Sequence, residues 1–332
     1  MAAIASPLLL PPTPMQRLFR LLGTEKRDIY YVYLYAIVTG LIGLSLPLGI
    51  QAVFNLVQSG AVFSSIYLLT GLVIAGVILT GLLLIGQTTL VEVIQQRIFA
   101  KAAFEFTYRL PRIRPDALEP YYPPELMNRF FDILTIQKGL PKLLIDLTAA
   151  AVQIIFGIIL LSIYHPVFLV FGLFTVLMVL AVALLNGRKA LKTSLNESKY
   201  KYKVVGWLED IARDLAFYRQ QHADLEPIDR MDELVANYLK YRNEHFSVLK
   251  RFYGNAVAFK TILTGGLLIV GTALVVSRGM TMGQFVAAEV MIVLITSSVE
   301  KLTMNIDVVF DLLTAVEKMG VVTDLPLEET HA

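Results

Sequence analysis

The residues of this sequence with the clearest chemical potential are polar side chains inside otherwise apolar stretches. One face of residues 282–307 carries five of them: Glu289, Thr296, Glu300, Thr303 and Asp307. Steps of 7, 4, 3 and 4 residues keep such side chains on one side of a helix. Ionisable groups are costly inside a membrane and often mark a substrate or ion pathway. The row therefore suggests polar atoms that line a passage.

A second polar row lies in the first apolar stretch, where Gln51 and Asn55 continue a four-residue spacing and Pro47 is expected to kink the helix. Our hypothesis is that this row and the Glu289 row line a central pathway. The alternative is that these side chains only join helices through hydrogen bonds. We favour hydrogen bonding for Gln51 and Asn55, leave both open for Glu289, and note that a solvated inner vestibule would also explain Glu300.

Other chemistry is poorly represented in the sequence. The chain has no cysteine, and its four histidines are not spaced as metal ligands. The formal net charge of +2 gives no reason to expect nucleic-acid binding. The string nearest to a phosphate-binding loop, Gly254–Thr261, has Phe259 where the second glycine must be. We therefore expect no catalytic residues, no metal site and no cofactor on this chain.

The elements that would position the polar rows are membrane-spanning helices. Of 332 residues, 56% are hydrophobic and only 17% are charged, which leaves too little polar surface for a soluble fold. Six apolar stretches are long enough to cross about 30 Å of hydrocarbon. They are Tyr30–Val57, Ile66–Gly86, Leu143–Tyr164, Val167–Leu185, Asn255–Ser277 and Met282–Asn305. The predicted fold class is an all-α membrane protein with six transmembrane helices.

The distribution of lysine and arginine predicts the orientation. The connections 58–65, 165–166 and 278–281 contain one basic residue, Arg278, whereas the other 28 of 29 lie at or near the opposite side. Because basic residues collect on the cytoplasmic side, we expect both termini in the cytoplasm. The protein would be a multi-pass protein of the plasma (inner) membrane.

The two connections on that side, about 56 and 69 residues long, have helical patterns of apolar and charged residues. We expect them to extend the spans as legs about 40 Å beyond the membrane. Each connection has one turn-rich centre, Leu110–Pro124 or Gly206–Ala216, in which we expect a short amphipathic helix. Such helices far from lipid need a partner to cover their apolar side, unless their aromatic residues cover each other. The residues in question are Ala117, Leu118, Tyr121, Tyr122, Trp207, Leu208, Glu209 and Ile211.

With these features the sequence resembles the membrane domain of ABC exporters, closest to the branch of type I secretion and bacteriocin or peptide exporters. The resemblance covers nearly all of residues 18–328 and depends on order and spacing more than on one motif. The matching stretches are LSLPLGIQAVFNLV (Leu44–Val57), EVIQQRI (Glu92–Ile98), PELMNRFFDILTIQKGL (Pro124–Leu140), ESKYKYKVVGWLEDIAR (Glu197–Arg213), RGMTMGQFVAAEVMI (Arg278–Ile292) and VFDLLTAVEKMGVVTDLPLE (Val309–Glu328).

The resemblance implies a dimer with a second copy or a homologous half, in which the fourth and fifth helices cross to the partner. It implies that the two tip helices, about Arg112–Tyr122 and Val205–Ala212, are coupling helices that dock on nucleotide-binding domains. ATP and magnesium would be bound by those domains and not by this chain. The substrate, moved out of the cytoplasm by alternating access, is not indicated.

The expected organisation is a disordered tail over residues 1–14, an interfacial elbow helix over 15–27 and the six-helix domain over 28–320. Residues 321–332 would be a truncated linker toward a nucleotide-binding domain. That domain could be a separate subunit, could have been cut off at the domain boundary, or could have been lost. Two rival functions stay open: a membrane scaffold or regulator that keeps the exporter fold without transport, and, less favoured, an ion-driven transporter.

Overall fold

The computed structural model is all-α and describes residues 12–60, 63–119, 121, 123–220 and 226–328. In this part of the chain, six helical spans are long and apolar enough to cross a membrane. They are Lys26–Gln58, Ser64–Arg112, Leu126–Tyr164, Val167–Arg213, Pro227–Val276 and Met282–Thr323. The predicted number of spans is confirmed, and the chain is a multi-pass helical membrane protein by helix length and hydropathy.

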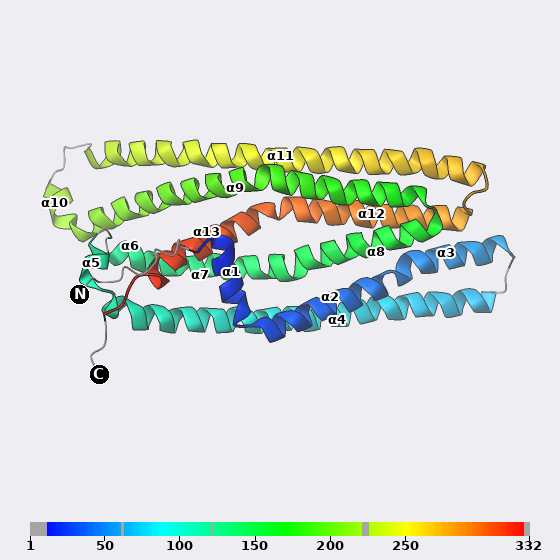
Figure 1. Ribbon diagram of the computed structural model, residues 1–332, viewed down its shortest axis with the longest axis horizontal. Helices are drawn as coiled ribbons and strands as arrows, with labels where there is room; N and C mark the ends of the chain where they lie inside the picture. The colour runs from blue at the N-terminus through cyan, green and yellow to red at the C-terminus, as the bar shows by residue number, and fades with distance from the viewer. Residues whose placement is uncertain (1–11, 61–62, 120, 122, 221–225, 329–332) are drawn as a thin grey trace, which may run out of the picture.

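Three very long helices set the dimensions of the molecule. Helices α4 (Phe63–Arg109), α9 (Val167–Arg213) and α11 (Glu226–Val276) run along its long axis (Figure 1). The 47 residues of α9 measure about 70 Å at 1.5 Å per residue. Since the hydrocarbon core is about 30 Å thick, such a helix exceeds that thickness by about 40 Å. The predicted continuation of the spans into legs is therefore confirmed.

The other spans are interrupted. The first consists of α2 (Lys26–Gly43) and α3 (Ser45–Gln58), which meet at Leu44. Pro47 explains this break, because proline has no N–H and its ring crowds the carbonyl group four residues earlier. The sixth consists of α12 (Met282–Met304) and α13 (Ile306–Thr323).

The third span is assembled from short segments. It contains α6 (Pro123–Asn128), a 3₁₀ turn, α7 (Asp132–Pro141), a π-helical turn over Lys142–Leu147 and α8 (Thr148–Tyr164). The π turn directly follows Pro141, whose missing N–H displaces the regular hydrogen bonding.

The two tips lie at one end of the molecule, which we call the tip end (Figure 1). At the first tip α4 ends at Arg109, just before Pro111, and among the described residues before Pro123 the α-helical segment is α5 (Pro115–Leu118). The expected helix Arg112–Tyr122 is thus reduced to one turn, because its prolines remove backbone donors.

At the second tip, the expectation of a separate helix over Val205–Ala212 is wrong. Helix α9 continues through these residues to Arg213, and the separate short helix is α10 (Leu215–Gln220). Gly206 alone does not end α9, since one glycine costs a helix only about 1 kcal/mol.

Helix α1 (Pro14–Gly23) lies across the bundle and packs on α13 (Figure 1). Thr13 caps it, because the Thr13 hydroxyl accepts from the N–H of Gln16 and the Gln16 side chain accepts from that of Thr13. Nη1 of the buried Arg17 lies 2.7 Å from the Glu317 carboxylate, and Nη2 donates to Asp324 at 2.6 Å. The segment predicted to lie in the membrane interface is thereby held on the sixth span.

The legs of the fourth and fifth spans pack on their own chain. Helix α9 contacts α11 along its length and also contacts α13. The hydroxyls of Ser194 and Thr314 lie 2.9 Å apart, and Tyr202 donates to the carboxylate of Asp132 on α7. The resemblance implies that these legs cross to a partner half, whereas here they lie against the third and sixth spans of the same chain.

Candidate functional site

The two tips adjoin each other and share a groove. Its walls include Leu110, Leu118 and Leu126 from the first connection and Glu209 from α9. Of the other residues expected at the first tip, Ala117 is half-buried and Tyr121 lies 5.6 Å beneath the Arg129 guanidinium, while Tyr122 lies outside the described residues. The structure therefore brings the two predicted tips together at one surface.

The apolar side chains predicted at the second tip differ in exposure. Trp207 is half-buried: its Nε1 donates to the Pro227 carbonyl at 3.1 Å, and its ring meets Tyr218 edge-on. Ile211 is also half-buried, whereas the Leu208 side chain is 52% exposed. The alternative that aromatic residues cover each other thus fits Trp207 but leaves Leu208 uncovered.

Sequence reasoning missed two further apolar side chains at this tip. Leu215 and Phe217 on α10 are about half exposed, at the end of the molecule farthest from the apolar stretches. The signal was present in the run Leu-Ala-Phe-Tyr, residues 215–218, which follows the charged end of α9. These two side chains and Leu208 are exposed apolar groups at the tip end, and the three are called here the tip surface.

The segment after α13 returns to the first tip. Ile113 and Leu327 form an antiparallel bridge, the N–H of Arg114 donates to Pro326 at 3.1 Å, and that of Glu328 donates to Arg112 at 2.8 Å. The end of the sixth span is thereby fixed to the connection between the second and third spans.

An ion-pair cluster joins the start of the first span to α4. Glu25 is buried and accepts from Arg97 at 3.1 Å and from Lys101, and Arg97 also contacts Asp28 at 2.5 Å. Burial acts to raise the pKa of the Glu25 carboxyl, but the hydrogen bonds and charges of Lys101 and Arg97 outweigh burial and hold this pKa below its usual value.

The residues of the two proposed pathway rows differ in their partners. Gln51 accepts a hydrogen bond from the Tyr164 hydroxyl at 2.6 Å, and Asn55 lies directly against Gly283 of α12. The alternative of hydrogen bonding between helices fits Gln51. Glu300 lies 3.4 Å from Lys260 of α11 and is partly exposed.

Two residues of the Glu289 row are enclosed in the bundle. The Thr296 hydroxyl is buried and donates to the carbonyl of Ile292 on its own helix. One carboxylate oxygen of Glu289 is buried without a hydrogen-bond partner among the described residues. Since an unpaired buried oxygen is costly, Glu289 is the residue of this row whose surroundings call for a further polar partner.

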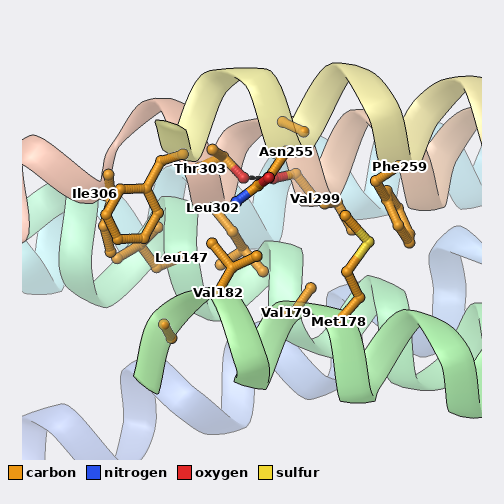
Figure 2. A pocket seen from close by; sticks show the side chains of 13 residues that line it. Leu147, Met178, Val179, Val182, Asn255, Phe259, Val299, Leu302, Thr303 and Ile306 are labelled. Atoms are coloured by element: carbon orange, nitrogen blue, oxygen red, sulfur yellow. Dashed lines mark hydrogen bonds between the residues drawn. The ribbon is translucent and has the colours of Figure 1, made fainter. Parts of the chain in front are cut away.

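A separate apolar cavity of about 160 Å³ lies between α9, α11 and the sixth span (Figure 2). Met178 and Val182 line it from α9, Phe259 from α11, and Val299 and Leu302 from α12. Its polar groups are few: Asn255, and a Thr303 hydroxyl that already donates to the Val299 carbonyl at 2.8 Å. A lining that is mainly apolar suits a small apolar group.

A comparison with models of known protein families finds no match for this chain, and a comparison with curated proteins finds no significant match. Function must therefore be inferred from the residues and the architecture.

Proposed function

We propose that this chain is the membrane-spanning half of an ATP-driven exporter, and that it moves a substrate out of the cytoplasm by alternating access. A nucleotide-binding partner would hold ATP and magnesium and supply the energy. The active unit would contain a second copy of this chain or a homologous half, embedded in the lipid bilayer.

The observation that carries the proposal is the exposed tip surface at the end of legs about 40 Å long. Lipid cannot cover Leu208 and Phe217 there, because the apolar stretches of α9 and α11 lie far along the same helices. Exposed apolar groups gathered at one place are typical of a surface for another protein.

The architecture supports transmission of force from such a partner. Helices α9 and α11 run unbroken from the tip end into the apolar region, so a displacement of their tips moves their membrane segments. The short bridge at Ile113 ties the first tip to the end of the sixth span. A partner at the tips would therefore act on five spans at once, the second to the sixth.

The test is purification of the tagged chain in digitonin from its own host, followed by measurement of ATP hydrolysis and azido-ATP labelling of whatever co-purifies. We expect a separate ATP-hydrolysing protein. Leu208→Glu should lower the associated activity about tenfold, because truncated interface anchors cost this much or more. Leu239→Glu is the matched control, since Leu239 is similarly exposed but lies within the leg of α11.

Purified chain without any ATP-hydrolysing partner, or equal losses in the two variants, would refute the proposal. The first result would favour the alternative of a membrane scaffold or regulator.

The proposed orientation has its own test, helped by the absence of cysteine from the sequence. In intact cells a membrane-impermeant maleimide should label Ser59→Cys, in the turn between the first two spans, and not Ala117→Cys at the first tip. The reverse pattern would invert the topology and place the tips outside.

A further inference from the structure

A polar pocket of about 250 Å³ lies between the legs of four helices, away from the tips and from the apolar cavity. Asp132 enters it from α7, Glu197 and Ser198 from α9, Tyr238 from α11 and Asp311 from α13. These residues come from four segments distant in the sequence, and none was singled out as a site by its local pattern.

Negative charge exceeds positive charge among the residues that line the pocket. Three carboxylates, of Asp132, Glu197 and Asp311, face two cations, Lys201 and Arg242. Outside the lining, Asp307 lies one turn before Asp311, and Lys318 and Arg129 lie near Asp132. The lining itself therefore carries one more negative than positive charge.

The carboxylates differ in their existing partners. Asp132 accepts from the Tyr202 hydroxyl, and Glu197 accepts from Arg242 at 2.8 Å. Asp311 is exposed to the pocket and has no hydrogen bond or ion pair with another residue in the described ranges. Asp311 is thus the carboxylate available to a bound molecule.

Ser198 gives the second, independent indication of a ligand. Its side chain is only 7% exposed, lines the pocket, and has a hydroxyl oxygen without a hydrogen-bond partner among the described residues. A buried hydroxyl without a partner is costly, and an N–H donor in the pocket would satisfy it.

The size and lining favour an organic ammonium ion over a metal ion. In the part of the chain that the structure describes, no group of three or more His, Cys, Asp or Glu side chains is arranged to hold a metal. A volume of about 250 Å³ greatly exceeds that of one bare ion. Tyr238, whose side chain could offer a hydroxyl or an aromatic face to an ammonium group, also lines the pocket.

We propose that this pocket binds a small aliphatic amine in its protonated form, with an ammonium group held by Asp311, Ser198 and Tyr238. The proposal does not depend on the exporter function, because it requires only this chain.

The probe is putrescine, a four-carbon diamine, measured as the radiolabelled compound by equilibrium dialysis against the full chain purified in detergent. Two competitors match its properties separately: Mg²⁺ has the same charge, and 1,4-butanediol has the same length without charge. We expect one saturable site per chain that unlabelled putrescine empties and neither competitor does.

Three variants locate the site. Asp311→Asn should weaken binding about tenfold, as expected for the loss of one charged contact, and Ser198→Ala should weaken it severalfold. Asp232→Asn, an exposed carboxylate on the leg of α11 outside the pocket, should leave it unchanged. The unfolding midpoint of each variant without ligand shows whether it is folded; if Asp311→Asn is not, Ser198→Ala decides.

Absence of saturable binding, equal displacement by Mg²⁺, or equal affinity in Asp311→Asn and Asp232→Asn would each overturn the proposal. The second result would indicate a metal site or charge screening, and the third would place the amine elsewhere.

Discussion

Replacement of Arg17 by methionine should release α1 from the sixth span without unfolding the bundle. Arg17 is 9% exposed, lies between the carboxylates of Glu317 and Asp324, and also donates to the Glu317 carbonyl at 3.2 Å. Methionine keeps an unbranched apolar chain but removes every one of these contacts. The change therefore isolates the polar part of the attachment.

The size of the effect follows from how exposed the partners are. Removing one member of a buried ion pair costs about 3–5 kcal/mol, whereas an exposed pair contributes about 0.2–1 kcal/mol. The Glu317 and Asp324 side chains are 29% and 33% exposed, so water replaces part of what Arg17 provides. We expect an intermediate loss of about 2 kcal/mol in the free energy of opening α1, or about 30-fold in its equilibrium constant.

Hydrogen–deuterium exchange with mass spectrometry measures this opening directly. Peptides covering α1 should exchange about 30-fold faster in Arg17→Met, while peptides covering α12 stay unchanged. Arg20→Met is the matched control, because Arg20 is on the same helix but exposed. Gly320→Ala should reproduce part of the effect, since a Cβ there would lie 2.5 Å from Arg17 Nη1 and displace the guanidinium.

Unchanged exchange of α1 in Arg17→Met, or equal acceleration in Arg20→Met, would refute this reasoning. Faster exchange of α1 and α12 together would mean that Arg17 stabilises the whole bundle and not the attachment of one helix.

Three other predictions concern packing, charge and connectivity. Gly157→Ala should destabilise the protein by about 1–3 kcal/mol, because a Cβ at Gly157 would lie within 3 Å of α12 side chains. Its unfolding midpoint should be lower than that of the control Gly187→Ala, where a Cβ would meet no atom within 4 Å. Folding lowers the pKa of Glu25, so the ionised carboxylate stabilises the protein at pH values above its ordinary pKa, and this stabilisation is lost as the pH falls through the folded-state pKa. Unfolding midpoints measured against pH should lack this pH-dependent stabilisation in Glu25→Gln. Ser194→Cys combined with Thr314→Cys should form a disulfide within one chain under oxidation, seen as a monomer on a denaturing gel; a covalent dimer would show that the legs cross to a partner.

The spans and legs could be predicted from the sequence because both are continuous patterns. A run of about 20 apolar residues identifies a span wherever it lies, and the helical spacing of Val91, Ile94 and Ile98 identifies a leg that buries one face. All three of these side chains are buried in the structure. Their spacing within one helix is enough to show that they share one face.

The tips and pockets could not be predicted to the same degree. Helix α9 continues past Gly206 to Arg213, and Trp207 contacts Tyr218 and Pro227 of later segments, which no local pattern indicates. Asp132 and Asp311 enter the same pocket from positions 179 residues apart, and no local spacing relates them. Which polar row faces a cavity is decided by helix rotation, which a single sequence leaves open.

The legs of α9 and α11 pack against α7 and α13 through apolar contacts at one end and polar contacts at the other. This difference indicates where the legs can separate. Near the apolar stretches, Val248 and Phe252 of α11 share a buried apolar cluster with Phe310 of α13. Farther toward the tips, hydroxyl and carboxylate contacts and the polar pocket replace that cluster. Parting polar groups into water costs less than exposing apolar ones, because their hydrogen bonds are exchanged for hydrogen bonds to water. The legs can therefore open at the tip end while their apolar part stays closed, and an ammonium ion bound in the pocket would oppose this opening by bridging Ser198 of α9 and Asp311 of α13.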